Sequence, residues 1–388
     1  MPNFRATALL LAVTMVALGA CRIPKRPNPT PPVPQAAPND DPMVSTNTLL
    51  AAAPDFALQR IGTPEFPVPP YAKFLKGVRI RLDPGHGGDA DKRAFKRGPT
   101  GVREAEINLR VAQYLRDLLV AAGAEVQLSR ESDVDLSYEE RAGANLPPQR
   151  WADLFISCHH NAIDNKPSAN HTTVWYHADV DYHPSNLDLA RYLCYGLYDH
   201  YPLEQITDEP LKSDQLMYPE GFAVLRHAKV TAALVETSFY TNPEEEQRLR
   251  RPESNLGEAY GLFIGLAKYA ANGLPRLKLI SPRDGLLASS ANGDVLEFIL
   301  DDGLRGRKSW GSERQMILTS SLNVRWDDQP LAFEFANDGY RLSARLPDHV
   351  SPGAHRVSVQ FQNLFKNSVI NPTVDIRVEE GSAAAESR

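Results

Sequence analysis

Four residues far apart in the 388-residue chain, His86, Glu104, His159 and Glu236, have side chains that suit a catalytic metal site. Imidazole nitrogens and carboxylate oxygens are donors that zinc accepts, and three protein ligands leave a fourth position open for water. The remaining carboxylate can then act as a general base towards that water. This chemistry requires all four side chains to meet in one crevice, so the elements that carry them decide whether the site can form.

His86 lies in the motif Asp83-Pro84-Gly85-His86-Gly87-Gly88, directly after the apolar run 78–82. Proline fixes one backbone dihedral and glycine permits conformations that other residues avoid, so the motif predicts a sharp turn at the end of a strand. The histidine would then stand at the carboxyl edge of a sheet. A glycine-rich turn that binds nothing is the alternative, and the Lys-Ser/Thr ending of a P-loop is absent.

Glu104 opens residues 104–122, where apolar side chains recur at the spacing of a helix. A carboxylate in the first turn of a helix also interacts well with the helix dipole. That structural role is therefore the alternative to metal binding, and Glu106 is a rival for either role.

His159 and His160 follow the apolar run 154–158, which predicts a buried strand. Successive side chains of a strand point to opposite faces, so the two rings cannot both enter one site without a bulge. A buried core histidine that binds no metal is the alternative for each.

Glu236 ends another apolar run, 232–235, and a glutamate there commonly caps a following helix. Open α/β sheets bind ligands in the crevice outside the carboxyl ends of their strands. Because several such polar endings are expected at one sheet edge, a shared site explains them better than separate structural roles do.

The fold class predicted for residues 73–274 is an α/β domain with a central sheet flanked by helices. Strands are expected at residues 78–82, 125–128, 154–158, 173–176 and 232–235. Helices are expected at residues 104–122, from Ser137 with Glu140 completing a capping box, at 186–201 and at 255–271.

Residues 275–380 have the short alternating segments of a small all-β domain, for which we predict an Ig-like β-sandwich. Strands are expected at residues 295–300, 315–318, 331–335, 340–346 and 355–361, with a hairpin turn at Asn337-Asp338-Gly339. Val357, Val359 and Phe361 alternate as one buried face. The tail, residues 381–388, has a composition typical of disorder.

The first 20 residues carry one early positive charge and an apolar run, which is the layout of an export signal. The ending Leu18-Gly19-Ala20-Cys21 resembles the lipobox of bacterial lipoproteins, which implies lipidation of Cys21. An ordinary cleaved signal peptide is the alternative. Residues 21–72 are rich in proline and are expected to form a tether without packed elements.

The composition allows a large core, since 42% of the residues are apolar. A formal net charge of -6 without long blocks of one sign gives no basic face for nucleic acid. With Cys21 lipidated, Cys158 and Cys194 remain, and we expect two buried free thiols rather than a disulfide bond.

The motifs together resemble the zinc-dependent N-acetylmuramoyl-L-alanine amidases of the family called amidase 3. The resemblance runs over residues 78–270. It rests on residues 83–88, on Glu104 with residues 107–109, on residues 157–162, and on residues 234–237 with Phe239 and Asn242-Pro243.

This resemblance implies that His86, Glu104 and His159 bind Zn²⁺ and that Glu236 is the catalytic carboxylate. The implied reaction is hydrolysis of the amide that joins the lactyl group of N-acetylmuramic acid to L-Ala of the peptidoglycan stem peptide. His160 stands where the family often has a small residue, so we expect it behind the ligands or facing the substrate. Residues 160–236 leave no clear room for the site-blocking helix that some members carry, and the sequence identifies no activator protein.

Two alternatives to this activity remain at this point. One is a zinc peptidase that cuts within the stem peptide, and the other is a non-catalytic lipoprotein that binds peptidoglycan. In an envelope with two membranes, Arg22 after the lipidated cysteine lacks the aspartate associated with inner-membrane retention. We therefore expect a lipid anchor on the periplasmic face of the outer membrane.

Overall fold

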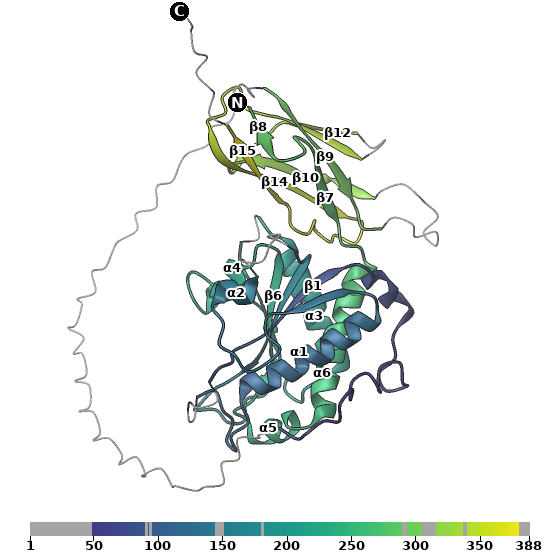
Figure 1. Ribbon diagram of the computed structural model, residues 1–388, viewed down its shortest axis with the longest axis vertical. Coiled ribbons are helices and arrows are strands. Elements are labelled where there is room, and N and C mark those ends of the chain that lie inside the picture. Colours follow the sequence, from purple (N-terminus) through teal and green to yellow (C-terminus); the bar gives the residue numbers. More distant parts are fainter. Residues whose placement is uncertain are drawn as a thin grey trace, which may run out of the picture. The chain divides into compact units, whose positions relative to one another are not determined.

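The computed structural model describes residues 49–89, 92, 95–143, 151–179, 182–288, 293–304, 316–336 and 340–379 (Figure 1). Several predictions concern residues outside these ranges: the signal peptide, Cys21, the first part of the tether, the hairpin turn at residues 337–339 and the tail at residues 381–388. Among the described residues, no helix combines the length and apolar character that crossing a membrane requires.

A six-stranded sheet forms the centre of the α/β domain. Its strands are β1 (Arg79–Pro84), β2 (Glu125–Leu128), β3 (Leu154–Asn161), β4 (Thr173–Tyr176), β5 (Leu211–Ser213) and β6 (Thr231–Phe239), in the spatial order β2-β1-β3-β6-β4-β5. The strands β2, β1, β3 and β6 are parallel, whereas β4 is antiparallel to β6. The sheet is thus mixed, and β5 is a strand that the sequence analysis did not predict.

Three long helices cover one face of this sheet: α1 (Glu104–Ala121), α3 (Ser185–His200) and α6 (Pro252–Ala271) (Figure 1). They pack on Leu154, Ile156 and Cys158, the side chains of β3 that point to this face. The opposite face carries Phe155 of β3, which packs against the short helix α4 (Ala223–His227). Alternation along β3 therefore divides the core of the domain into two layers.

The predicted helices are confirmed within one to three residues, and their ends have local causes. Gly123 follows α1 with a φ of 88°, a conformation that glycine adopts without steric strain. The helix α2 (Tyr138–Ala142) begins with the expected capping box, in which the backbone N–H of Glu140 donates to Ser137 Oγ over 3.2 Å. The helix α5 (Pro243–Leu249) and the 3₁₀ turns η1 (Pro70–Leu75) and η2 (Asp214–Leu216) were not predicted.

The expectation of an unpacked tether up to residue 72 is wrong for residues 49–72. Phe66 is buried against the ring of Tyr260 at 5.4 Å between centroids, and Ile61 forms a bridge with Phe66. Phe56 packs on Tyr114 at 5.7 Å. The proline-rich composition concealed these aromatic anchors, which fix the segment to α1 and α6.

The C-terminal domain is all-β and contains two sheets around one apolar core. One sheet has the order β11-β10-β14-β15-β8, formed by β8 (Leu286–Leu287), β10 (Ile317–Trp326), β11 (Gln329–Pro330), β14 (Gly353–Asn363) and β15 (Thr373–Val378). The other has the order β12-β13-β9-β7, formed by β7 (Arg276–Ser281), β9 (Val295–Asp301), β12 (Phe333–Ala336) and β13 (Arg341–Arg345).

Pairing in this domain is antiparallel except between β15 and β8. Val357, Val359 and Phe361 are buried together, as their alternation predicted. The strands β7 and β15 were missed because charged residues interrupt their apolar runs.

Contacts between the two domains involve the amino edge of the six-stranded sheet. Asn371 Oδ1 accepts the backbone N–H of Thr231, the first residue of β6, over 2.8 Å. Arg276 forms an ion pair of 2.6 Å with Asp153, which directly precedes β3. These two contacts do not involve the carboxyl edge of the sheet, which carries His86, His159 and Glu236.

The segment before η1 supplies a stability test. Phe66→Ala should lower the free energy of unfolding by about 3 kcal/mol, because it removes a buried aromatic ring. Leu58→Ala, on the same segment but 52% exposed, should change it by less than about 0.5 kcal/mol. Urea unfolding of the full chain measures both, and equal values would show that the segment is not docked.

Candidate metal centre

His86 lies in a turn after β1 that is stabilised by hydrogen bonds from Arg130. It has a φ of 61°, and Gly87 follows with a φ of 133°. Arg130 donates to the carbonyl oxygens of Pro84, Gly85 and Ala105 over 3.0, 3.0 and 2.7 Å. One buried guanidinium thus connects the turn before His86 with the first turn of α1, using donors that a lysine could not spread in this way.

Glu104 is the first residue of α1, and its carboxylate is buried. Its Oε1 lies 3.2 Å from His86 Nε2 and 3.1 Å from His159 Nδ1. The Lys96 ammonium lies 3.7 Å from its Oε2. The capping alternative does not account for these contacts, and the rival Glu106 is paired instead with Arg103 at 3.2 Å.

His159 lies inside β3 rather than beyond its end, which corrects the expected strand boundary at residue 158. The register between β3 and β6 shifts between His159 and Asn161. The two adjacent rings do not both enter the site, so the bulge that a shared site would have needed is not required. The ring of His159 packs over Gly85, where an added Cβ would lie 2.2 Å from its Cε1. A glycine at this position is therefore required for the ring to enter the site.

Glu236 lies within β6, opposite His159 in the register of the two strands. The strand therefore continues beyond the predicted end at residue 235, because pairing with β3 and β4 supplies hydrogen bonds past the apolar run. Its Oε2 is buried and has no hydrogen-bond partner in the described part of the chain. Burial and the charge of Glu104 raise the pKa of Glu236, while Lys96 opposes this rise.

The residues that converge here fit a divalent transition metal. His86, Glu104 and His159 each offer a ligand atom, and these atoms all lie within 4.8 Å of one another. The two imidazole rings are perpendicular, at 88°, with centroids 4.6 Å apart. Two nitrogen donors and one carboxylate are a set that zinc takes in catalytic sites. Glu236 is the partner of His159 in the sheet register, and its unpaired oxygen is available for chemistry.

The protonation states also suit a metal ligand set. Burial lowers the pKa of His159 to about 4, against the opposing hydrogen bond to Glu104, so the ring is neutral near pH 7. Although burial acts to raise it, hydrogen bonds with His159 and His86 hold the pKa of Glu104 well below its ordinary value. Metal ligands must be deprotonated, and these two groups are.

Comparison with known proteins identifies a matching family. Residues 80–265 match the model of a family described as N-acetylmuramoyl-L-alanine amidase and called amidase 3. We refer to these matched residues as the amidase 3 domain.

Two curated relatives match about half of the chain. The amidase 3 domain region is similar to N-acetylmuramoyl-L-alanine amidase LytC of Bacillus subtilis, with 32% identity over 197 residues, which is 50% of this chain and 36% of LytC. Probable cell wall amidase LytH of Staphylococcus epidermidis is 29% identical over 195 residues, 50% of this chain and 59% of LytH. The chain thus spans only part of the length of these relatives.

Solved structures of amidases are also similar. N-acetylmuramoyl-L-alanine amidase AmiC2 of Nostoc punctiforme is 26% identical with a TM-score of 0.41, covering 50% of this chain and 98% of that one. The N-acetylmuramoyl-L-alanine amidase of Clostridium difficile 630 is 25% identical with a TM-score of 0.43, covering 50% and 97%.

Within the amidase 3 domain, His160 does not join the cluster of candidate ligands. Its ring is buried between Asn108 of α1 and Glu258 of α6, at 2.9 and 3.0 Å. Only its backbone N–H reaches Glu104 Oε1, over 3.3 Å. Of the two places expected for His160, the structure thus shows the one behind the ligands.

The sequence analysis missed the residues that support the ligands. Arg141 pairs with the buried Asp83 at 2.8 Å, and its Nη2 also lies 3.1 Å from His159 Nε2. Arg130 and Lys96 were missed as well. Each is a single basic residue outside the strand-ending motifs, so only its position in the fold reveals its role.

The two thiols are free, as expected, but only one of them is buried. Cys158 and Cys194 are free, the first buried and the second partly buried, and burial raises the pKa of Cys194 to about 11. Between His160 and Glu236, the described residues form only α3, β4, β5, η2 and α4. None of these is an additional long helix.

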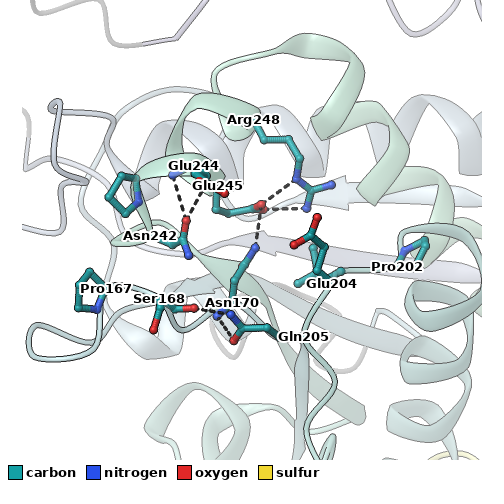
Figure 2. A pocket seen from close by; sticks show the side chains of 12 residues that line it. Pro167, Ser168, Asn170, Pro202, Glu204, Gln205, Asn242, Glu244, Glu245 and Arg248 are labelled. Atoms are coloured by element: carbon teal, nitrogen blue, oxygen red, sulfur yellow. Dashed lines mark hydrogen bonds and ion pairs between the residues drawn. The ribbon is translucent and has the colours of Figure 1, made fainter.

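A hollow of about 580 Å³ is lined by the β3–β4 connection, residues 202–205 and α5 (Figure 2). Its polar groups bind one another: Glu245 accepts from Arg248 over 2.7 Å and from Asn170 over 3.1 Å. None of the four predicted site residues lines it. A smaller hollow of about 260 Å³ adjoins His86 and is lined in part by Tyr138 and Arg141.

The close approach at Gly85 gives a test of the centre. Gly85→Ala should abolish tight zinc binding, because the added methyl group would occupy the space of the His159 ring. Gly257→Ala, on α6, meets its nearest atom only at 3.3 Å and should retain binding. Isothermal titration calorimetry with zinc measures both, and unchanged affinity of Gly85→Ala would contradict the geometry.

Proposed function

We propose that the protein is a zinc-dependent N-acetylmuramoyl-L-alanine amidase. It hydrolyses the amide between the lactyl group of N-acetylmuramic acid and L-Ala of the stem peptide in peptidoglycan. The observation that carries this proposal is the convergence of His86, Glu104 and His159 in an amidase 3 domain, with the unpaired carboxylate oxygen of Glu236 beside them.

In this proposal His86, Glu104 and His159 hold the metal. Zinc bound there would supply a Lewis acid that polarises the amide carbonyl and makes water a stronger nucleophile at neutral pH. Glu236 accepts the proton of the attacking water and then donates it to the nitrogen of the leaving amine. The unpaired Oε2 of Glu236 is the atom free to hold that proton.

The electrostatics around Glu236 support this role. Burial and the neighbouring Glu104 raise the pKa of Glu236, which makes its carboxylate a stronger base. The charge of Lys96 opposes this rise in the pKa of Glu236. A base whose pKa is shifted towards the working pH transfers protons most efficiently in both directions.

Removing the base should abolish most of the activity. With isolated sacculi as substrate, Glu236→Ala should release stem peptides about 10²- to 10⁴-fold more slowly, the range typical of a lost acid–base group. Glu106→Gln, which changes a nearby carboxylate outside the cluster, should retain activity. Chelation of the metal should stop the reaction and added zinc should restore it.

Mass spectrometry of the released fragments identifies the bond that is cut. Free stem peptides that begin at L-Ala support the amidase. Fragments cut inside the peptide would indicate a zinc peptidase instead. Absence of any release by the zinc-loaded wild-type chain would favour the non-catalytic peptidoglycan-binding lipoprotein.

We also propose that the C-terminal domain is an Ig-like sandwich that spaces or targets the enzyme at the cell wall. Two mainly antiparallel sheets sharing one core support this class of fold. The domain contacts the amino edge of the α/β sheet through Thr231 and Asp153. The metal centre lies at the opposite, carboxyl edge.

We further propose that a lipid on Cys21 anchors the protein to the periplasmic face of the outer membrane. Leu18-Gly19-Ala20-Cys21 supports the anchor, and Arg22 supports the choice of membrane. Cys21→Ser should move the protein from the membrane fraction to the soluble fraction of lysed cells. Retention of Cys21→Ser in the membrane fraction would contradict the anchor, and fractionation of the two membranes tests its location.

A further inference from the structure

The side chain of His160 forms a buried connection behind the metal centre. Its ring is fully enclosed, with Nδ1 2.9 Å from Asn108 Oδ1 and Nε2 3.0 Å from Glu258 Oε2. Asn108 belongs to α1 and Glu258 to α6. A histidine on β3 therefore links two helices that cover the same face of the sheet.

The orientation of the Asn108 amide follows from its other contacts. Its Nδ2 donates to the carbonyl oxygen of Gly85 over 3.2 Å and to Glu104 Oε1 over 3.3 Å. The amide oxygen must then face His160 and accept from a protonated Nδ1. In the flipped orientation, the Asn108 NH₂ group would face the N–H of His160. Its oxygen would face the Gly85 carbonyl and the Glu104 carboxylate, which are both acceptors.

Glu258 fixes the other side of the His160 ring. Its Oε2 faces Nε2, so a proton lies between the imidazole and the carboxylate. Its Oε1 accepts from the hydroxyl of Thr237 over 2.8 Å. Thr237 directly follows Glu236 in β6, so this connection also reaches the strand that carries the expected base.

Through Asn108, these hydrogen bonds reach the Glu104 carboxylate and the Gly85 carbonyl, both of which belong to the metal centre. Glu104 Oε1 is the oxygen nearest to both histidine ligands, and Gly85 is both the residue before His86 and the one over which the His159 ring packs. Partners behind metal ligands orient those ligands, and losing such a partner commonly weakens metal binding substantially.

We propose that His160 is a positioning residue of the metal centre. Held by Glu258, it orients the amide of Asn108, which in turn fixes the Glu104 carboxylate and the Gly85 carbonyl. This inference rests on the proposed zinc centre. It assigns a function to a histidine that contacts neither the metal position nor the reacting atoms.

The proposal is tested on the full chain by measuring zinc affinity in competition with a chromophoric chelator, and thermal unfolding of the metal-free protein. His160→Leu and Glu258→Leu should each weaken zinc binding by roughly 10- to 100-fold. Glu258→Gln keeps groups able to bond both His160 and Thr237 and should restore most of the affinity.

A matched control separates positioning from stability. Asn255 lies one turn before Glu258 on α6, is equally buried, and bonds Leu249 and Arg110 rather than the centre. Asn255→Ala should lower the thermal midpoint while leaving zinc affinity unchanged. If His160→Leu behaves like this control, His160 has only a structural role and the proposal is overturned.

Asn108→Ala tests the same connection while keeping both members of the His160–Glu258 pair, and it decides the matter if His160→Leu does not fold. It should weaken zinc binding to a similar extent, and wild-type affinity in Asn108→Ala would overturn the proposal. Wild-type protein that binds no zinc would overturn the metal centre itself and this inference with it. Tight binding by the wild type and by all variants would overturn this inference alone.

Discussion

The carboxylate of Glu104 is buried, and removing an ionised carboxylate from water costs several kcal/mol unless other donors replace that water. In this domain the donors come from separate elements: the turn after β1, strand β3, helix α1 itself and the loop that carries Lys96. Each element must therefore be in place before the charge can be accommodated. The arrangement of turn, helix and strand around the carboxylate follows from this requirement.

The space at the centre is as constrained as its charge. Gly85 has no side chain where the His159 ring lies, and Arg130 holds the carbonyl groups on either side of this contact. A longer side chain at position 85 would expel the ring, and without the guanidinium three buried carbonyl groups would each lose a donor. The conformation of this turn is thus constrained both by its close packing against His159 and by its hydrogen bonds to Arg130.

Local features of this fold could be predicted from the sequence, whereas features that depend on distant partners could not. The α2 capping box needs only Ser137 and Glu140, β2 alternates polar and apolar residues, and β4 is a short apolar run, so their positions were predicted correctly. The ends of β3 and β6 were placed too early because these strands stabilise each other beyond their apolar runs. The antiparallel direction of β4 also depends on its partner, and no local pattern reports it.

The same distinction holds for the centre. His86, Glu104, His159 and Glu236 were found because each follows or begins an element with a clear pattern. Arg130, Arg141 and Asn108 support them from positions whose chemistry is set only by which carbonyl, carboxylate or ring lies opposite in the fold. The candidate ligands of such a centre can therefore be identified from motifs, whereas the geometry that brings them together depends on residues that motifs do not identify.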